Sequence, residues 1–245
     1  MLPSAQSDPF GFETLEAFSR ASAINRWLYE KISGYVQGKV LEIGSGIGNI
    51  STFILKNQPF VSLSDLRPEY CRLLEKKFSH DPHLKGVYEL DLSESNFESA
   101  HAELLGKFDT VIALNVIEHI EDDSLAIRNA WSLLGKEGKL IVLVPAGQWL
   151  YNQLDKELGH FKRYSKNGLN NLMKSAGFRI YDSRFFNAAA IWGWWFSGKL
   201  LREKTISPAK LNLFNQLVPI FRITDWFAAP FAGISVISVG IKNLN

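Results

Sequence analysis

Three glycines at alternate positions follow a short apolar run near the start of the chain. Residues 40–43 have the length and composition of a buried strand, and Gly44, Gly46 and Gly48 come directly after them. Residues 50–55 then show helical spacing. Because glycine has no Cβ, the backbone can turn sharply here and approach a ligand, and the N–H groups of the next helix point to the same place. The stretch predicts the strand–turn–helix unit of a nucleotide-binding α/β fold.

The residues after this unit narrow the class of cofactor. A second predicted strand, residues 61–64, ends at Asp65, where an acid in such a fold holds the ribose hydroxyls. The glycine spacing is G-x-G-x-G, and Asn49 stands where a dinucleotide fingerprint, G-x-G-x-x-G, has its third glycine. This spacing argues against a nicotinamide cofactor. A glycine-rich turn that binds no ligand is the alternative interpretation.

Length and composition fit one large α/β domain. The chain has 245 residues, 46% hydrophobic and 21% charged, and its net charge of +2 gives no indication of a nucleic-acid partner. The single cysteine, Cys71, excludes an internal disulfide and fits a reducing compartment. Residues 1–9 lack the pattern of a signal peptide, and no apolar run reaches the roughly 20 residues of a membrane-spanning helix. We therefore expect a cytoplasmic protein.

Predicted helices and strands alternate along the rest of the chain. Residues 1–12 are expected to form a loose arm, followed by one or two amphipathic helices within residues 13–33. Asp91 follows the third predicted strand and is an acceptor for the adenine amino group, the N-cap of a helix, or both. Further strands are expected over residues 86–90, 108–114, 139–145, 178–186 and 234–241, and helices over residues 68–78, 122–135 and 167–176.

Two longer strings carry a resemblance: FDTVIALNVIEHIEDD over residues 108–123 and LLGKEGKLIVLVPA over residues 133–146. With the glycine motif, Asp65 and Asp91, they resemble the motifs of class I S-adenosylmethionine (SAM)-dependent methyltransferases over roughly residues 36–182. The resemblance implies a Rossmann-like three-layer sandwich. Its seven-stranded sheet is mostly parallel, and the antiparallel last strand lies between the fifth and sixth strands. The N-terminal helical segment is implied to cover the cofactor cleft.

By the same resemblance, SAM is the methyl donor and S-adenosylhomocysteine the product. The implied cofactor-binding residues are Glu42, Gly44, Gly46 and Gly48 beside the methionine portion, Asp65 and Leu66 beside the ribose and adenine, and Asp91 and Leu92 at the adenine edge. Asn115 stands where many relatives carry Asp, and an amide can accept a hydrogen bond but offers no charge to the cofactor ammonium. The five histidines and Cys71 show no metal-ligand spacing, so we expect no metal.

Two histidines are candidates for the base that removes a proton from a hydroxyl acceptor. His119 follows the fourth predicted strand, whose carboxyl end faces the ligand crevice, and the ordinary pKa of histidine suits proton transfer near neutrality. The alternative for His119 is a structural histidine bonded to Glu118 or Glu121. For His160 the alternative is a loop residue that pairs with the backbone.

The long connection 146–166 is a second candidate for substrate contact, because long loops in compact domains tend to be functional. It contains the string GHFKRYS over residues 159–165. Similar strings recur in small-molecule members of the family that the chain resembles, and the resemblance assigns Arg163 and Tyr164 to the substrate pocket.

Residues 187–232 are predicted to form a helical lid before the last strand. They contain four of the seven tryptophans, and basic residues such as Arg202 and Lys204 lie between the aromatic clusters. We predict that the lid selects an apolar or amphiphilic acceptor through Trp194 and Trp195. A structural cap on the core and a dimer contact are the alternatives, and the same surface could touch a membrane. A monomer and a homodimer both remain open.

The sequence thus predicts one domain, with a helical cover over residues 1–35, a cofactor-binding core over 36–186, the lid over 187–232 and a last strand over 233–242. The predicted function is methyl transfer from SAM to a small or lipid-like acceptor, at a hydroxyl. A non-catalytic SAM- or nucleotide-binding partner subunit is the alternative, and a nicotinamide oxidoreductase is a third, weaker hypothesis. Peripheral contact with a membrane is compatible with the cytoplasmic location.

Overall fold

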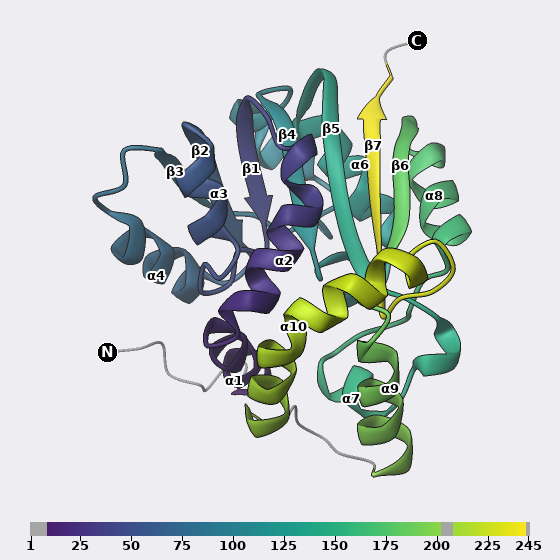
Figure 1. The fold of residues 1–245 in the computed structure, drawn as a ribbon. Coiled ribbons are helices and arrows are strands. Elements are labelled where there is room, and N and C mark those ends of the chain that lie inside the picture. The colour runs from purple at the N-terminus through teal and green to yellow at the C-terminus, as the bar shows by residue number, and fades with distance from the viewer. Residues whose placement is uncertain (1–8, 202–207, 244–245) are drawn as a thin grey trace.

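The computed structural model describes residues 9–201 and 208–243, which form a seven-stranded sheet in the order β3-β2-β1-β4-β5-β7-β6 (Figure 1). β7 is antiparallel to both β5 and β6, whereas the pairs among β1 to β5 are parallel. This arrangement confirms the predicted Rossmann-like fold, including the position of the last strand. The strands are β1 (Lys39–Ile43), β2 (Phe60–Asp65), β3 (Leu84–Glu89), β4 (Phe108–Leu114), β5 (Leu134–Pro145), β6 (Phe178–Phe186) and β7 (Ser235–Lys242).

Helices cover both faces of the sheet. Local sequence signals mark where α4 and α6 begin: Pro68 occupies the first turn of α4, and the side chain of Asp122, the N-cap of α6, accepts a hydrogen bond from the backbone N–H of Leu125. The α-helices are α1 (Pro9–Ser19), α2 (Ser22–Ile32), α3 (Ser51–Asn57), α4 (Pro68–Phe78), α5 (Phe97–Ala100), α6 (Asp123–Leu133), α7 (Gln153–Glu157), α8 (Lys166–Ser175), α9 (Ala190–Trp195) and α10 (Pro208–Ala228).

The core is divided between the two faces of the sheet. Neighbouring residues of one strand point to opposite sides, so Val111 packs with α5, α6 and α8 while Ile112 packs with α2, α3 and α4. Leu140 and Ile141 of β5 divide in the same way. Because both faces are covered, the central strands are apolar throughout, which explains the continuous apolar runs in the sequence.

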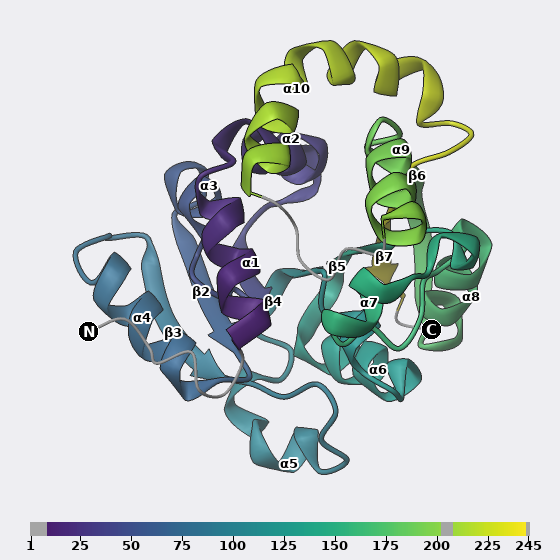
Figure 2. The same ribbon diagram turned by 90° about the horizontal axis from the view of Figure 1, so that it is seen from below.

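The carboxyl ends of the parallel strands meet at one edge of the sheet. In Figure 1 this is the lower edge, toward which the arrow of β1 points, and α1, α7, α9 and α10 gather there. Figure 2 looks onto this edge and shows α10 arching from α2 toward the β6 side. Ligands of open α/β sheets bind outside this edge, so the fold places the candidate site among these helices.

Two predictions about the backbone are wrong. Residues 9–12 belong to α1 rather than to a loose arm, because Pro9 has the fixed φ angle that favours the first position of a helix. β5 begins at Leu134 rather than at Lys139, because Leu134 already pairs with Phe108. Residues 135–138 form a bulge before Lys139 pairs with Thr110, and Glu137 in that bulge has a φ of 58°. The predictions for residues 1–8, Arg202 and Lys204 lie outside the described residues.

The division of the chain into cover, core, lid and last strand stays a prediction. Within residues 9–201 and 208–243, no helix combines the length and the apolar character needed to cross a membrane.

Candidate active site

The glycine loop after β1 owes its shape to backbone conformations that only glycine adopts readily. Gly44, Gly46 and Gly48 have φ angles of 68°, 54° and 79°. A Cβ at Gly44 would lie 2.5 Å from Cγ2 of Val116, in the loop after β4. The ammonium of Lys77 from α4 donates hydrogen bonds to backbone carbonyls of the loop, 2.7 Å from that of Ile47. The loop is therefore fixed by its neighbours and directly contacts the end of β4.

The side chain of Asp65 lies inside this loop. Its Oδ2 accepts a hydrogen bond from the backbone N–H of Gly46 at 2.9 Å, and its Oδ1 accepts one from the N–H of Arg67 at 3.0 Å. Leu66 follows it and is exposed. The predicted acid at the end of β2 is thus brought together with the glycines, although contact with a ribose stays a prediction.

Asp91 is not a helix N-cap. Its Oδ1 accepts hydrogen bonds from the backbone N–H and the hydroxyl of Ser93, at 2.8 and 2.7 Å, whereas α5 begins later, after Asn96. An Asx turn of this kind competes with a cap for the same carboxylate. The neighbouring Leu92 is buried. The predicted contact of both residues with adenine stays a prediction.

Two polar residues flank the glycine loop on the sheet side. Glu42 is buried and accepts a hydrogen bond from the hydroxyl of Ser51 at the start of α3. Burial raises the pKa of Glu42 to about 7, and the Ser51 hydrogen bond opposes that rise only in part. Asn115, at the end of β4, is exposed and has a φ of 55°, a conformation that asparagine tolerates better than most residues.

Helix α1 lies directly on the glycine loop. A Cβ at Gly46 would lie 2.9 Å from Cδ1 of Leu15, and the side-chain amide of Asn49 donates a hydrogen bond to the carbonyl of Leu15 at 2.9 Å. A cover by the N-terminal helices was expected from the resemblance. Nothing local in the sequence marks Leu15 as a neighbour of the loop.

A second polar cluster follows β4, the strand next to β1. Glu118 and His119 lie on a short 3₁₀ turn, Ile117–His119, and His160 comes from the connection between β5 and α8. The rings of His119 and His160 are 4.8 Å apart between centroids and nearly perpendicular. The backbone N–H of Phe161 donates to the carbonyl of Glu118 at 2.8 Å and ties the two segments together. The structure therefore brings both predicted histidines to one place.

His160 is held by a buried acid that the sequence did not reveal. Its Nδ1 lies 2.9 Å from Oδ1 of Asp155, and Nε of Arg163 lies 2.8 Å from the same oxygen. Burial alone would raise the pKa of Asp155, but the hydrogen bond from His160 and the charge of Arg163 lower it. The backbone of His160 is also bonded, since its carbonyl accepts from the hydroxyl of Tyr151 at 2.7 Å. The imidazole of His160 thus pairs with a side-chain carboxylate rather than with the backbone, as the structural alternative had expected, and its catalytic role stays a prediction.

Glu118 does not pair with His119, contrary to one predicted alternative. The residue is fully buried, and within the described ranges neither of its carboxylate oxygens accepts a hydrogen bond from another residue. Burial raises the pKa of Glu118 to about 8, an effect that its own backbone N–H and the charge of Arg163 reduce. An isolated carboxylate at this position is an arrangement that functional sites often contain.

The residues predicted to line the substrate pocket are held in place by side-chain contacts. The hydroxyl of Tyr164 donates to Asp123 at 2.8 Å, and burial followed by this hydrogen bond raises the pKa of Tyr164. The guanidinium of Arg163 lies 4.7 Å from the ring centroid of Trp194 on α9. The indole N–H of Trp194 is buried and has no hydrogen-bond partner in the described part of the chain, while Trp195 is partly exposed. Their contact with a substrate stays a prediction.

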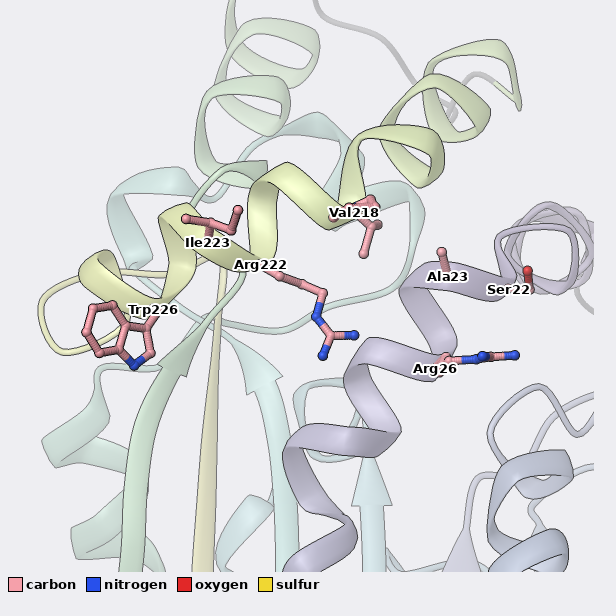
Figure 3. A pocket seen from close by; sticks show the side chains of 8 residues that line it. Ser22, Ala23, Arg26, Val218, Arg222, Ile223 and Trp226 are labelled. Carbon is pink, nitrogen blue, oxygen red and sulfur yellow. The ribbon is translucent and has the colours of Figure 1, made fainter.

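A pocket of about 760 Å³ lies elsewhere, between α2 and α10 (Figure 3). In Figure 3 the side chain of Arg222 points from α10 toward α2, and it forms an ion pair with Glu30 at 2.6 Å. None of the predicted site residues lines this pocket, so the candidate site is defined by the two loops and not by this cavity. Its lining residues are Ser22, Ala23, Arg26, Val218, Pro219, Arg222, Ile223 and Trp226.

The strand order, the glycine loop and the acid after β2 define the class of protein: a Rossmann-like fold of the kind found in SAM-dependent methyltransferases. A family model described as a methyltransferase domain matches residues 17–183, and the chain belongs to the class I SAM-dependent methyltransferase family.

Curated relatives agree with this family, and a solved structure has a similar fold. The chain is 27% identical over 157 residues to the ubiquinone biosynthesis O-methyltransferase of Xanthomonas euvesicatoria, a match that covers 59% of this chain and 64% of the relative. The Xanthomonas axonopodis protein of the same name is 26% identical over 65% of this chain and 72% of its own. A SAM-dependent methyltransferase from Thermotoga maritima has a TM-score of 0.60 at 15% identity, covering 95% of this chain and 97% of its own.

Proposed function

We propose that this chain transfers the methyl group of SAM to a hydroxyl oxygen of a small, amphiphilic acceptor. The observation that carries the proposal is the contact between the glycine loop and the turn that holds Glu118 and His119. β1 and β4 are parallel neighbours, and Val116 fills the space that a side chain at Gly44 would occupy. A cofactor on the first loop would therefore present its methyl group to the second. The names of the Xanthomonas relatives favour an oxygen acceptor.

The cofactor half of the proposal rests on backbone groups and acids around the glycine loop. In it, the Asp65 carboxylate accepts hydrogen bonds from the ribose hydroxyls, and Glu42, Gly44, Gly46 and Gly48 surround the methionine portion. Leu66, Asp91 and Leu92 flank adenine, and Asn115 faces the cofactor ammonium. The loop already holds one carboxylate against a backbone N–H, at Gly46, which supports its use for polar ligand groups.

The acceptor half rests on the cluster after β4. The sulfonium of SAM is already an activated donor, so alignment of the acceptor supplies much of the catalysis. A hydroxyl acceptor must also lose its proton, and His119 and His160 are the groups available for this step. The Trp194 ring stacks on Arg163, and its indole N–H, which has no hydrogen-bond partner among the described residues, is a donor for a second polar atom of the acceptor.

An amphiphilic acceptor is supported by the surface of the lid. Large aromatic side chains of α9 and of the region after α10 are exposed, Trp192 by 76% and Phe231 by 83%. Exposed aromatic side chains of this kind can contact an apolar ligand, a partner or a lipid surface. We include peripheral contact with a membrane in the proposal, with the lipid-like acceptor as its reason.

The test supplies the protein with SAM carrying a labelled methyl group and a cell extract divided into organic and aqueous fractions. We expect a labelled product in the organic fraction and no product with Gly46→Val, which blocks the cofactor loop. Calorimetric SAM binding without any labelled product would instead favour the non-catalytic binding subunit.

A further inference from the structure

Among residues 9–201 and 208–243, no other residue donates a hydrogen bond to either oxygen of the buried Glu118 carboxyl group. An ionised carboxylate away from water is costly unless it is paired or coordinates a metal. Arg163, the cation whose charge acts on it, is already engaged by Asp155 and by the carbonyl of Ala146 at 3.1 Å. A cation from outside the chain would therefore supply the partner that this carboxyl group lacks among the described residues.

Two imidazoles complete a set of ligands around that carboxylate. One carboxylate oxygen of Glu118 and one ring nitrogen each of His119 and His160 lie within 4.8 Å of one another. With Nδ1 of His160 engaged by Asp155, Nε2 is the nitrogen left for coordination. A carboxylate behind a histidine fixes the tautomer and ring orientation of metal-ligating histidines in just this manner. Arg163 forms an ion pair with Asp155, so it fixes the carboxylate that orients His160.

We propose that Glu118, His119 and His160 bind a divalent transition-metal cation at the acceptor side of the site. Two imidazoles and a carboxylate are a ligand set for Zn²⁺, Fe²⁺ or Mn²⁺ that leaves positions open for water or substrate oxygen. Ligand bonds of about 2.1 Å require ligand atoms no more than about 4.2 Å apart. The exposed His119 therefore has to move slightly inward. No ligand spacing along the chain marks this site, because its ligands come from two segments about forty residues apart.

The cation explains how the acceptor hydroxyl is activated, and this part rests on the proposed function. The hydroxyl oxygen binds at an open position, its O–H bond breaks, and the proton passes to solvent. The resulting oxyanion forms a bond to the methyl carbon of SAM. The S–CH₃ bond breaks with its electron pair retained by sulfur, which gives the methyl ether and neutral S-adenosylhomocysteine. A bound cation lowers the pKa of coordinated oxygen, so no protein base is required in this scheme.

Co²⁺ is the probe for the experiment, because its visible absorption reports coordination by nitrogen and oxygen. The full chain is first stripped with a chelator and then titrated with Co²⁺, and with Zn²⁺ and Mn²⁺ by calorimetry. We expect one cation per chain. Glu118→Gln and His119→Gln should each weaken binding by at least about 10-fold, and the exposed His80→Gln is the matched control that should leave it unchanged.

Stability provides the second readout. Glu118→Gln is nearly isosteric and replaces a buried ionisable group with a neutral amide, so the variant should fold and melt no earlier than the stripped wild type. Added cation should raise the melting temperature of the wild type but not of the variant. Wild-type protein that binds no cation, or a Glu118→Gln variant that binds it equally well, would overturn the proposal.

SAM binding is measured on the same samples to separate the two proposals. Stripped protein that binds SAM and still transfers methyl groups at the full rate would refute the cation site while leaving the methyltransferase function intact. Protein that binds the cation but not SAM would refute the proposed function instead.

Discussion

The β1–β2 side of the catalytic edge is built from backbone, whereas the β4–β5 side is built from side chains. On the first side, glycine φ angles shape the loop, and its N–H and C=O groups pair with Asp65 and Lys77. On the second side, Asp155, His160 and Arg163 meet from separate positions of a long connection and face Glu118. A backbone site suits a ligand common to a whole family, while a side-chain site can be changed residue by residue to suit one acceptor.

Replacing His119 should have the largest effect on turnover. We expect His119→Gln to lower methyl transfer by about 10²–10⁴-fold, the usual contribution of a group that manages the acceptor proton. SAM affinity should stay unchanged, because the cofactor side does not depend on this side chain. Initial rates and SAM calorimetry on the same preparation measure both quantities, with His80→Gln as the control. Full activity in His119→Gln would contradict the assignment of acceptor activation to the β4–β5 side.

Glu42, on the cofactor side of the site, should make the stability of the protein depend on pH. Its folded-state pKa of about 7 lies above the ordinary value of 4.5, so between these values the folded protein keeps a proton that the unfolded chain has lost. The free energy of unfolding therefore falls as the pH rises from about 4.5 to about 7, by up to about 3 kcal/mol, and stays level above pH 7. Glu42→Gln should abolish this fall. Urea unfolding of both proteins at pH 5 and pH 8 measures the change in the free energy of unfolding. An equal change in both proteins would mean that Glu42 is ionised at both pH values.

Variants of Asp65 show how far SAM binding depends on a side chain rather than on the backbone of the glycine loop. Asp65→Ala removes an ionised acceptor and should weaken SAM binding by about 1.5–3 kcal/mol. Asp65→Asn keeps one acceptor oxygen for the N–H of Gly46, so its loss should be smaller. Calorimetry on folded variants ranks the three proteins. Equal SAM affinity in all of them would rule out a ribose contact.

Two tryptophans of one helix give the smallest and most closely matched comparison. The Trp194 ring stacks on Arg163, whereas Trp192 is 76% exposed. Trp194→Ala should lower the free energy of unfolding by about 0.5–2 kcal/mol and reduce transfer, and Trp192→Ala should change stability by no more than about 0.5 kcal/mol. Chemical denaturation and initial rates measure both. If both variants had the same stability and the same transfer rate, the lid would be better described as a structural cap.

The same contrast explains what the sequence could predict. Local patterns predict the strands with apolar runs, the glycine loop, and residues at or after strand ends, such as Asp65 and His119. They do not predict the roles of Leu15 and Asp155, because each depends on contacts between segments far apart or on the capping box of α7. Asp91 was ambiguous because one carboxylate could serve a cap or a turn, and only the start of α5 decided between them.

Gly46→Val and Glu118→Gln, compared in SAM calorimetry and methyl transfer, test the separation of the two sides most directly. Gly34→Val is the control, since a Cβ at Gly34 would have no atom within 4 Å. Gly46→Val should lose SAM binding and transfer together, because valine is strained at a φ of 54° and would press on Leu15. Glu118→Gln should bind SAM with wild-type affinity and lose transfer. The opposite result, in which Glu118→Gln loses SAM affinity as severely as Gly46→Val or transfers methyl groups at the wild-type rate, would contradict a divided site.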